Sequence, residues 1–187
     1  MDKLNYFSTP IWAEEKPEFV KSLNKTSDKY IKKNKIYSVM NNNKFLDFKN
    51  YAGVKSWQFL DEHGYDLNQY KIILSEMSVQ EFSKDYRSAH INGNQHVSGF
   101  YFLKCNDKTS YPVFYEPKIG ARTTKLKMKE NLKDVVSGME QICFKPIPGT
   151  LIIFPGYLEY EFPLGVKPFR FIHWNIQAIP KRMAKDD

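Results

Sequence analysis

The sequence has only two cysteines, Cys105 and Cys143, among its 187 residues. Two cysteines do not make the disulfide framework of a small secreted domain. Neither lies in a C-x-x-C pair, so the sequence gives no sign of a structural zinc site. We therefore expect two free thiols in a reducing compartment.

Long apolar runs are also missing. No stretch of about 18 apolar residues is present, which argues against a membrane-spanning helix. The start of the chain, as far as Trp12, has neither the apolar segment nor the small-residue cleavage site of a signal peptide. The sequence therefore predicts a soluble, cytoplasmic protein with no membrane partner.

Repeats, low-complexity linkers and abrupt changes of composition are absent as well. A chain of 187 residues with 42% hydrophobic and 16% aromatic residues is typical of one globular domain, which we place at residues 1–187. The formal net charge is +7. The lysines are spread along the chain without an arginine-rich stripe, so we expect a solvated surface and no nucleic-acid partner. Oligomeric state is not predicted.

The first part of the chain, about 1–70, reads as helical. Apolar residues recur with a period near 3.6 from Pro17 to Lys33, and Pro17 suits the first turn of a helix. A second helix is expected over Val54–Glu62, with a further turn at Leu67–Tyr70. Asn41–Asn43 reads as a short polar break.

The sequence pattern changes over about 71–178, where short apolar or alternating runs are separated by turn residues. This pattern predicts a mainly β fold, a double-stranded β-helix or jelly-roll buttressed by the N-terminal helices. The expected strands are Lys71–Phe82, Tyr86–Asn92, Val97–Lys104, Val113–Tyr115, Thr123–Lys127, Gln141–Pro146, Thr150–Pro155, Tyr157–Pro163 and Phe169–Gln177.

The segment from His90 to Leu103 is the most informative for chemistry. Residues i and i+2 of a strand face the same way, so His90 and Asn92 are expected to point into one cavity. This is the spacing at which a jelly-roll presents two ligands to one metal. The alternative is a polar strand end whose side chains are satisfied locally.

Two later segments complete the pattern. Pro148–Pro163 reads as a buried strand, a Pro-Gly turn and a second strand that contains Tyr160. In Pro168–Gln177, Arg170 stands alone in an apolar strand, where a guanidinium is costly unless it meets an anion. That anion is either a bound carboxylate, which suits the planar fork of arginine, or an internal Asp or Glu.

These three segments resemble the 2-oxoglutarate and Fe(II)-dependent oxygenases related to prolyl 4-hydroxylases, in the branch found in marine phages and bacteria. The likeness runs from Tyr6 to Pro180. It is densest in Ser98–Leu103, Pro148–Pro155 and Phe169–Gln177. The resemblance implies a cupin-like jelly-roll and, if the chain is encoded by a phage, a place in the host cytoplasm.

The resemblance also implies a site. His90 falls at the first iron ligand, Asn92 at the second and Tyr160 at the distal ligand, and Arg170 falls where the far carboxylate of 2-oxoglutarate is bound. Such enzymes present a 2-His-1-carboxylate set or a close variant, so Asn92 and Tyr160 depart from the pattern. His96, Glu159 and Glu161 are alternative ligands.

Two remaining histidines have structural interpretations. His63 lies at an expected helix end, where a cationic side chain favours the helix dipole. His173 alternates away from Arg170 and reads as a hydrogen-bonded residue of the sheet.

Two functions follow from the resemblance. One is a hydroxylase that uses Fe(II) and 2-oxoglutarate, with ascorbate as a further cofactor, on a substrate that the sequence does not name. The alternative is a catalytically silent jelly-roll that binds a ligand or partner, because two expected iron ligands are replaced. The enzyme requires His90, Asn92, Tyr160 and Arg170 to meet around a common hollow.

Overall fold

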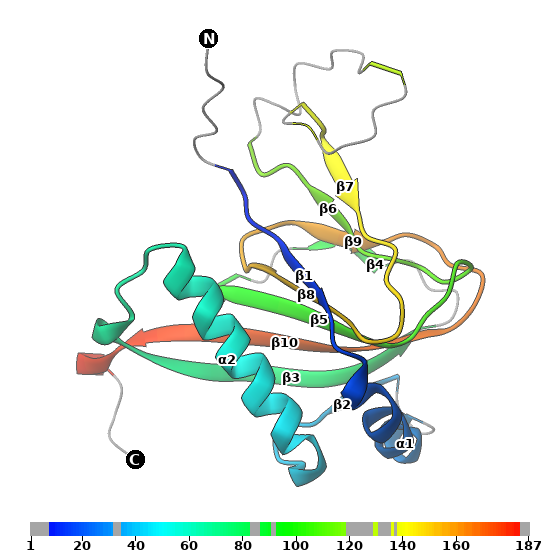
Figure 1. Cartoon of the computed structure of the whole chain (residues 1–187), viewed down its shortest axis with the longest axis horizontal. Helices are drawn as coiled ribbons and strands as arrows, with labels where there is room; N and C mark the ends of the chain where they lie inside the picture. The colour runs from blue at the N-terminus through cyan, green and yellow to red at the C-terminus, as the bar shows by residue number, and fades with distance from the viewer. Residues whose placement is uncertain are drawn as a thin grey trace.

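Two antiparallel sheets form the β core, and two helices cover the outer face of the larger one (Figure 1). A computed structural model describes residues 8–31, 35–82, 87–90, 93–118, 129–130, 136 and 138–183, with the backbone alone for 87–90. The predicted mainly β jelly-roll fold is confirmed.

The larger sheet has six strands, in the spatial order β1-β8-β5-β10-β3-β2. Their bounds are β1 Trp12–Glu15, β2 Ile36–Ser38, β3 Tyr70–Phe82, β5 Val97–Lys104, β8 Thr150–Pro155 and β10 Phe169–Pro180. The smaller sheet has the order β4-β9-β6-β7. Its strands are β4 Arg87–His90, β6 Val113–Tyr115, β7 Gln141–Cys143 and β9 Tyr160–Phe162.

The strands β5, β6 and β8 have the bounds that the sequence predicts. The strands β7 and β9 are shorter than expected and β10 is longer. The ends of the expected strand Tyr86–Asn92 and all of Thr123–Lys127 lie outside the described residues. The part expected to be helical, about 1–70, contains two helices and also the strands β1 and β2. Each is a short edge strand, hydrogen-bonded to one neighbour only, and such strands leave little periodicity in a sequence.

The helices are α1, Val20–Ile31, and α2, Leu46–Glu62, with four 3-10 turns: η1 Pro17–Phe19, η2 Asn43–Phe45, η3 Leu67–Gln69 and η4 Lys181–Met183. Helix α2 begins well before the predicted Val54. The predicted polar break is in fact a cap, because the side chain of Asn42 accepts a hydrogen bond from the Lys44 backbone N–H. No helix among the described residues has the length and apolar character needed to span a membrane.

The outer face of the larger sheet packs against both helices. Trp174 of β10 is fully buried, its indole N–H donates to Ser56 Oγ of α2 at 3.1 Å, and its ring lies edge-on to Phe48. The ring also covers Gly99 of β5, where an added Cβ would lie 2.1 Å from a Trp174 ring carbon. Gly99 is therefore the position at which the sheet accepts the indole.

Substituting Gly99→Ala should lower the free energy of unfolding by about 3 kcal/mol, because overpacking forces the indole or the strand to move. Urea denaturation followed by circular dichroism measures the change. Gly53→Ala is the matched control, since nothing lies within 4 Å of an added Cβ there. In α2 the control should gain about 0.5–1 kcal/mol. Equal stabilities for the two variants would contradict the packing described.

The two thiols should react differently, because Cys105 is buried and Cys143 is exposed. Burial raises the pKa of the Cys105 thiol to about 12, and its Sγ lies 3.2 Å from the Pro146 carbonyl oxygen. At neutral pH a disulfide reagent should modify Cys143 quickly and Cys105 only on unfolding. A thiol count of one in the native protein and two in denaturant is expected. Rapid modification of both in the native state would contradict the burial of Cys105.

Candidate functional site

The pairing of β4 with β9 brings two predicted iron ligands together. His90 and Tyr160 are direct cross-strand partners in the smaller sheet. The side chain of His90 and all of Asn92 lie outside the described residues. The backbones of the first and distal ligand positions are thus neighbours, and their role as iron ligands stays a prediction.

Tyr160 faces the space between the two sheets and is 1% exposed. Its ring packs against Phe100 of β5, with centroids 5.0 Å apart, and against Phe154 of β8, at 5.4 Å. Both contacts have edge-on geometry, which favours aromatic pairs. Tyr160 thus joins the two sheets through aromatic packing.

Arg170 does not face this space. In β10 the residues Phe169, Phe171 and His173 point between the sheets, whereas Arg170 and Ile172 point to the helix-covered face. The guanidinium Nε donates to Glu81 Oε2 at 2.8 Å. The expectation that Arg170 anchors 2-oxoglutarate beside Tyr160 is therefore not met.

The partners of Arg170 explain its burial. Besides Glu81 on the neighbouring strand, Nη1 donates to Asp28 Oδ1 at 2.8 Å and to Asn24 Oδ1 at 3.1 Å, both on α1. These bonds satisfy an arginine that is 5% exposed and connect α1 to the sheet. The structure thus has the alternative that the sequence allowed, an internal ion pair.

Aromatic rings occupy most of the inner face. Phe100 contacts Phe162 of the smaller sheet at a centroid distance of 5.3 Å, and Phe114 contacts Phe154 at 4.8 Å. Rings at these distances touch directly, so this part of the inter-sheet space is a packed core. The nine aromatic residues of this inner cluster are Phe82, Phe100, Phe102, Phe114, Phe154, Tyr160, Phe162, Phe169 and Phe171.

The other end of the same face is polar. Ser98 Oγ donates to Asn175 Oδ1 at 2.7 Å, and Asn175 Nδ2 donates to Glu76 Oε2 at 3.1 Å. Gln80 Nε2 donates to Ser78 Oγ at 2.9 Å. His173 is the cross-strand partner of Ser78 and packs 5.4 Å from the Phe100 ring. His173 is buried in the sheet, and its interpretation as a hydrogen-bonded residue stays a prediction. The bonds between Ser98, Asn175 and Glu76 and between Gln80 and Ser78 join the other polar groups of this face.

The alternative ligands do not gather around Tyr160. His96 is exposed, and its Nδ1 accepts a hydrogen bond from the Ala178 N–H at 3.1 Å. Glu161 alternates with Tyr160 and Phe162 along β9, so it points to the other face of the smaller sheet. Glu159 is half-buried just before β9. None of these three placements completes a ligand set.

A 2-oxoglutarate-bound iron needs three protein donors and a cation for the far carboxylate. Among the described residues, no group of three or more His, Cys, Asp or Glu side chains is arranged to hold a metal ion. The ring of Tyr160 packs against Phe100 and Phe154, and the guanidinium of Arg170 lies on the opposite face of the larger sheet. The described side chains of Tyr160 and Arg170 therefore do not share one hollow, while the His90 side chain and Asn92 lie outside the described residues.

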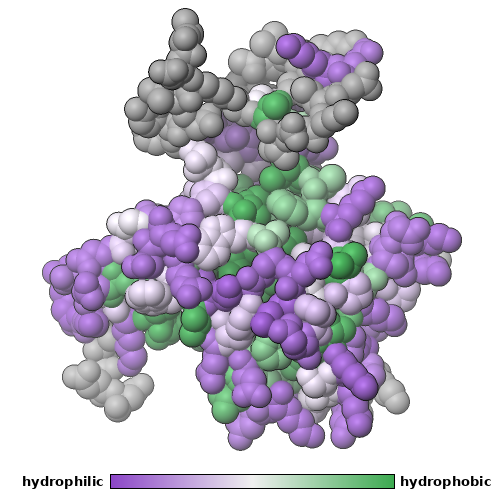
Figure 2. Space-filling model, in the orientation of Figure 1, coloured by the Kyte–Doolittle hydropathy of each residue, from purple (hydrophilic) through white to green (hydrophobic). Residues whose placement is uncertain are grey.

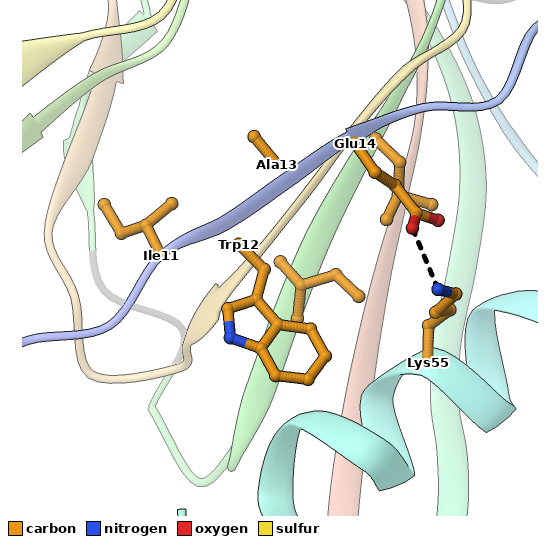
Figure 3. A pocket seen from close by; sticks show the side chains of 7 residues that line it. Ile11, Trp12, Ala13, Glu14 and Lys55 are labelled. Carbon is orange, nitrogen blue, oxygen red and sulfur yellow. Dashed lines mark hydrogen bonds and ion pairs between the residues drawn. The ribbon is translucent and has the colours of Figure 1, made fainter. Parts of the chain in front are cut away.

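One hollow of about 330 Å³ lies on the outer side of the sheet, between β1 and α2. In Figure 3 the Trp12 side chain points toward α2, and Glu14 meets Lys55, whose Nζ lies 2.8 Å from the Glu14 carboxylate. Burial raises the pKa of Glu14, but hydrogen bonds from Lys55 and Tyr51 more than offset it, so this pKa lies below its usual range. The polar groups of this hollow thus pair with each other and fasten β1 to α2.

Sequence reasoning missed the inner polar groups of Glu76, Ser78, Gln80 and Ser98. The alternation of polar and apolar residues in Glu76–Phe82 is a signal for them. It appears as a two-residue pattern once Met77 and Val79 are assigned to the helix-covered face.

Part of the chain matches the sequence model of a known protein family. Residues 77–166, just under half of the chain, match the sequence model of the family described as "Putative 2OG-Fe(II) oxygenase". No curated protein matches the chain. The matched range includes His90, Asn92 and Tyr160 but ends before Arg170.

Solved structures show the same fold at low sequence identity. A prolyl-4-hydroxylase of Pseudomonas putida superposes with a TM-score of 0.63 at 10% identity, over 91% of this chain and 94% of that one. The viral collagen prolyl hydroxylase of Paramecium Bursaria Chlorella virus-1 gives 0.61 at 13% identity, over 91% and 96%. HygX from Streptomyces hygroscopicus, solved with nickel and 2-oxoglutarate bound, gives 0.61 at 8% identity, over 92% and 83%.

The protein therefore has the 2-oxoglutarate oxygenase fold, and its predicted resemblance to that family, related to prolyl 4-hydroxylases, is confirmed. Its sequence carries the 2OG-Fe(II) oxygenase pattern over residues 77–166. Placement in a marine phage or bacterial branch stays a prediction.

The structural role of Arg170 is testable. Arg170→Ala should lower the free energy of unfolding by about 3 kcal/mol, because the partly buried Glu81 carboxylate loses its partner. Urea denaturation measures this, with exposed Arg182→Ala as the control that should leave stability unchanged. An unaltered unfolding curve for Arg170→Ala would contradict the ion-pair role.

Proposed function

We propose that this protein is a catalytically silent member of the oxygenase fold, which acts by binding a partner. The observation that carries the proposal is the orientation of β10. Of its inward positions, Phe169 and Phe171 are apolar rings and His173 is a buried imidazole, while its arginine is bonded to Glu81 and Asp28 on the other face.

The chemistry of the available donors supports this proposal. Fe(II) is held well by imidazole and carboxylate, whereas the two substituted positions offer a neutral amide at Asn92 and a phenol at Tyr160. A neutral phenol is a poor ligand for Fe(II). The far carboxylate of 2-oxoglutarate would also need a cation, and Arg170 of β10 is bonded to Glu81 and Asp28 on the other face of the sheet.

An anaerobic titration tests the proposal. Purified protein mixed with 2-oxoglutarate and Fe(II) should develop no metal-to-ligand charge-transfer band. In air it should produce no succinate from 2-oxoglutarate. The prolyl-4-hydroxylase of Pseudomonas putida, which shares the fold, is the positive control. A charge-transfer band, or turnover of 2-oxoglutarate above the metal-free blank, would overturn the silent assignment.

A second candidate is a hydroxylase that uses Fe(II) and 2-oxoglutarate, with ascorbate as a reductant. It is favoured by the family match over residues 77–166 and by the pairing of His90 with Tyr160. Its substrate class is open, because the substrates in the names of the prolyl hydroxylases are those of the named proteins alone. The same titration decides between the two candidates, because this one requires the charge-transfer band.

A further inference from the structure

The positive charge of the chain is concentrated in one segment. Residues 20–49 contain eight lysines and two aspartates, a balance of 8 − 2 = +6, out of +7 for the whole chain. The lysines are spread along the chain, but outside residues 20–49 acidic residues nearly balance them. The eight are Lys21, Lys25, Lys29, Lys32, Lys33, Lys35, Lys44 and Lys49.

Three of these lysines form a row along α1. Lys21, Lys25 and Lys29 are four residues apart and exposed, while Leu23 and Ser27 of the same helix are buried against the sheet. A spacing of four residues is a rise of about 6 Å along a helix. The row therefore extends about 12 Å along the outer side of α1.

Acidic side chains do little to neutralise this row. Asp28, the only carboxylate within α1, accepts the Arg170 hydrogen bond at 2.8 Å. Within the part of the chain that the structure describes, Lys21, Lys25 and Lys29 make no ion pair. The one carboxylate of α1, that of Asp28, is thus paired with Arg170.

Two stacked aromatic rings lie where α1 meets β2, one of them from Tyr30, which follows Lys29 in sequence. Tyr30 of α1 and Tyr37 of β2 stack with centroids 4.3 Å apart and an interplanar angle of 9°. Both are only half-buried. Aromatic faces next to lysines are the combination with which proteins bind single-stranded nucleic acids, through base stacking and phosphate contacts.

The surroundings of α1 favour nucleic acid over a membrane. A helix that inserts into a lipid surface needs a free apolar side. The apolar side of α1, with Val20, Leu23 and Ile31, packs on the core of the larger sheet. No large apolar side chain of α1 is exposed, and the atoms over α1, at the lower right of Figures 1 and 2, are hydrophilic.

We propose that the outer side of α1 with the adjoining β2, called here the lysine face, binds nucleic acid through its phosphate backbone. The partner class is single-stranded DNA or RNA without base specificity. This proposal names the partner for the binding role proposed above, and it rests on that role in this one respect. The helix α1 packs on the outer face of the larger sheet, whereas Tyr160 lies between the two sheets, so the two proposals fail separately.

Fluorescence anisotropy with a labelled oligonucleotide of about 30 nucleotides tests the lysine face. The wild-type chain should bind, and its affinity should fall as salt is raised. The triple variant K21Q/K25Q/K29Q should bind on the order of 100-fold more weakly at about 0.1 M salt, because three phosphate contacts are lost. The slope of log affinity against log salt should also fall by about 2.

The control is K71Q/K118Q/K181Q, which removes the same charge from exposed positions outside residues 20–49. It should keep nearly all of the affinity, and circular dichroism should report native α1 and sheet in both variants. If the α1 triple variant does not fold, the single variants K21Q and K29Q serve, each with roughly fivefold loss. Equal loss in the two triple variants would overturn the proposal.

Two competitors separate the other classes of partner. Vesicles of anionic phospholipid and polyglutamate are offered at equal charge concentration to the same protein. Preference for the oligonucleotide supports the proposal, whereas binding only to vesicles or to polyglutamate overturns it. The Fe(II) and 2-oxoglutarate titration is independent of all these outcomes.

Discussion

The two-residue alternation of β10 is the constraint on which the rest of the structure depends. It sends Phe169, Phe171 and His173 into the inter-sheet space and sends Arg170, Ile172 and Trp174 to the helices. Because side chains alternate along a strand with a period of two residues, fixing the face of one residue fixes the face of all the others. With this arrangement, one face of β10 completes an aromatic core, and the other fastens α1 and α2 to the sheet.

The sequence predicts the strands of the β core well, for a physical reason. The strands β5, β6 and β8 are buried runs bounded by turn residues, so their signal is local. The edge strands β1 and β2 acquire their conformation from β8 and β3, which are distant in sequence. No local pattern marks such pairings. The start of α2 was missed because asparagines that cap a helix look like a loop.

The candidate site shows where counting along the chain stops being informative. Tyr160 and Arg170 are ten positions apart, but the loop Pro163–Pro168 separates their strands. A loop resets the phase of alternation, and the pairing of β10 with β5 also shifts register between Arg170 and Phe171. The spacing therefore predicts that both residues are near one end of the sheets. It does not predict which face of its sheet each side chain points to. His90 and Tyr160, in contrast, are direct partners on paired strands, so no loop intervenes in the register that joins them.

The distribution of tryptophans gives the larger sheet its own optical reporter. Trp174 is sealed between Gly99 and α2, whereas Trp57 of the same helix is 43% exposed and faces solvent. Emission from Trp174 depends on whether α2 rests on the sheet, while that from Trp57 depends chiefly on water. Replacing Trp57 and Trp12 by phenylalanine would leave a single indole whose emission maximum follows the docking of α2 alone.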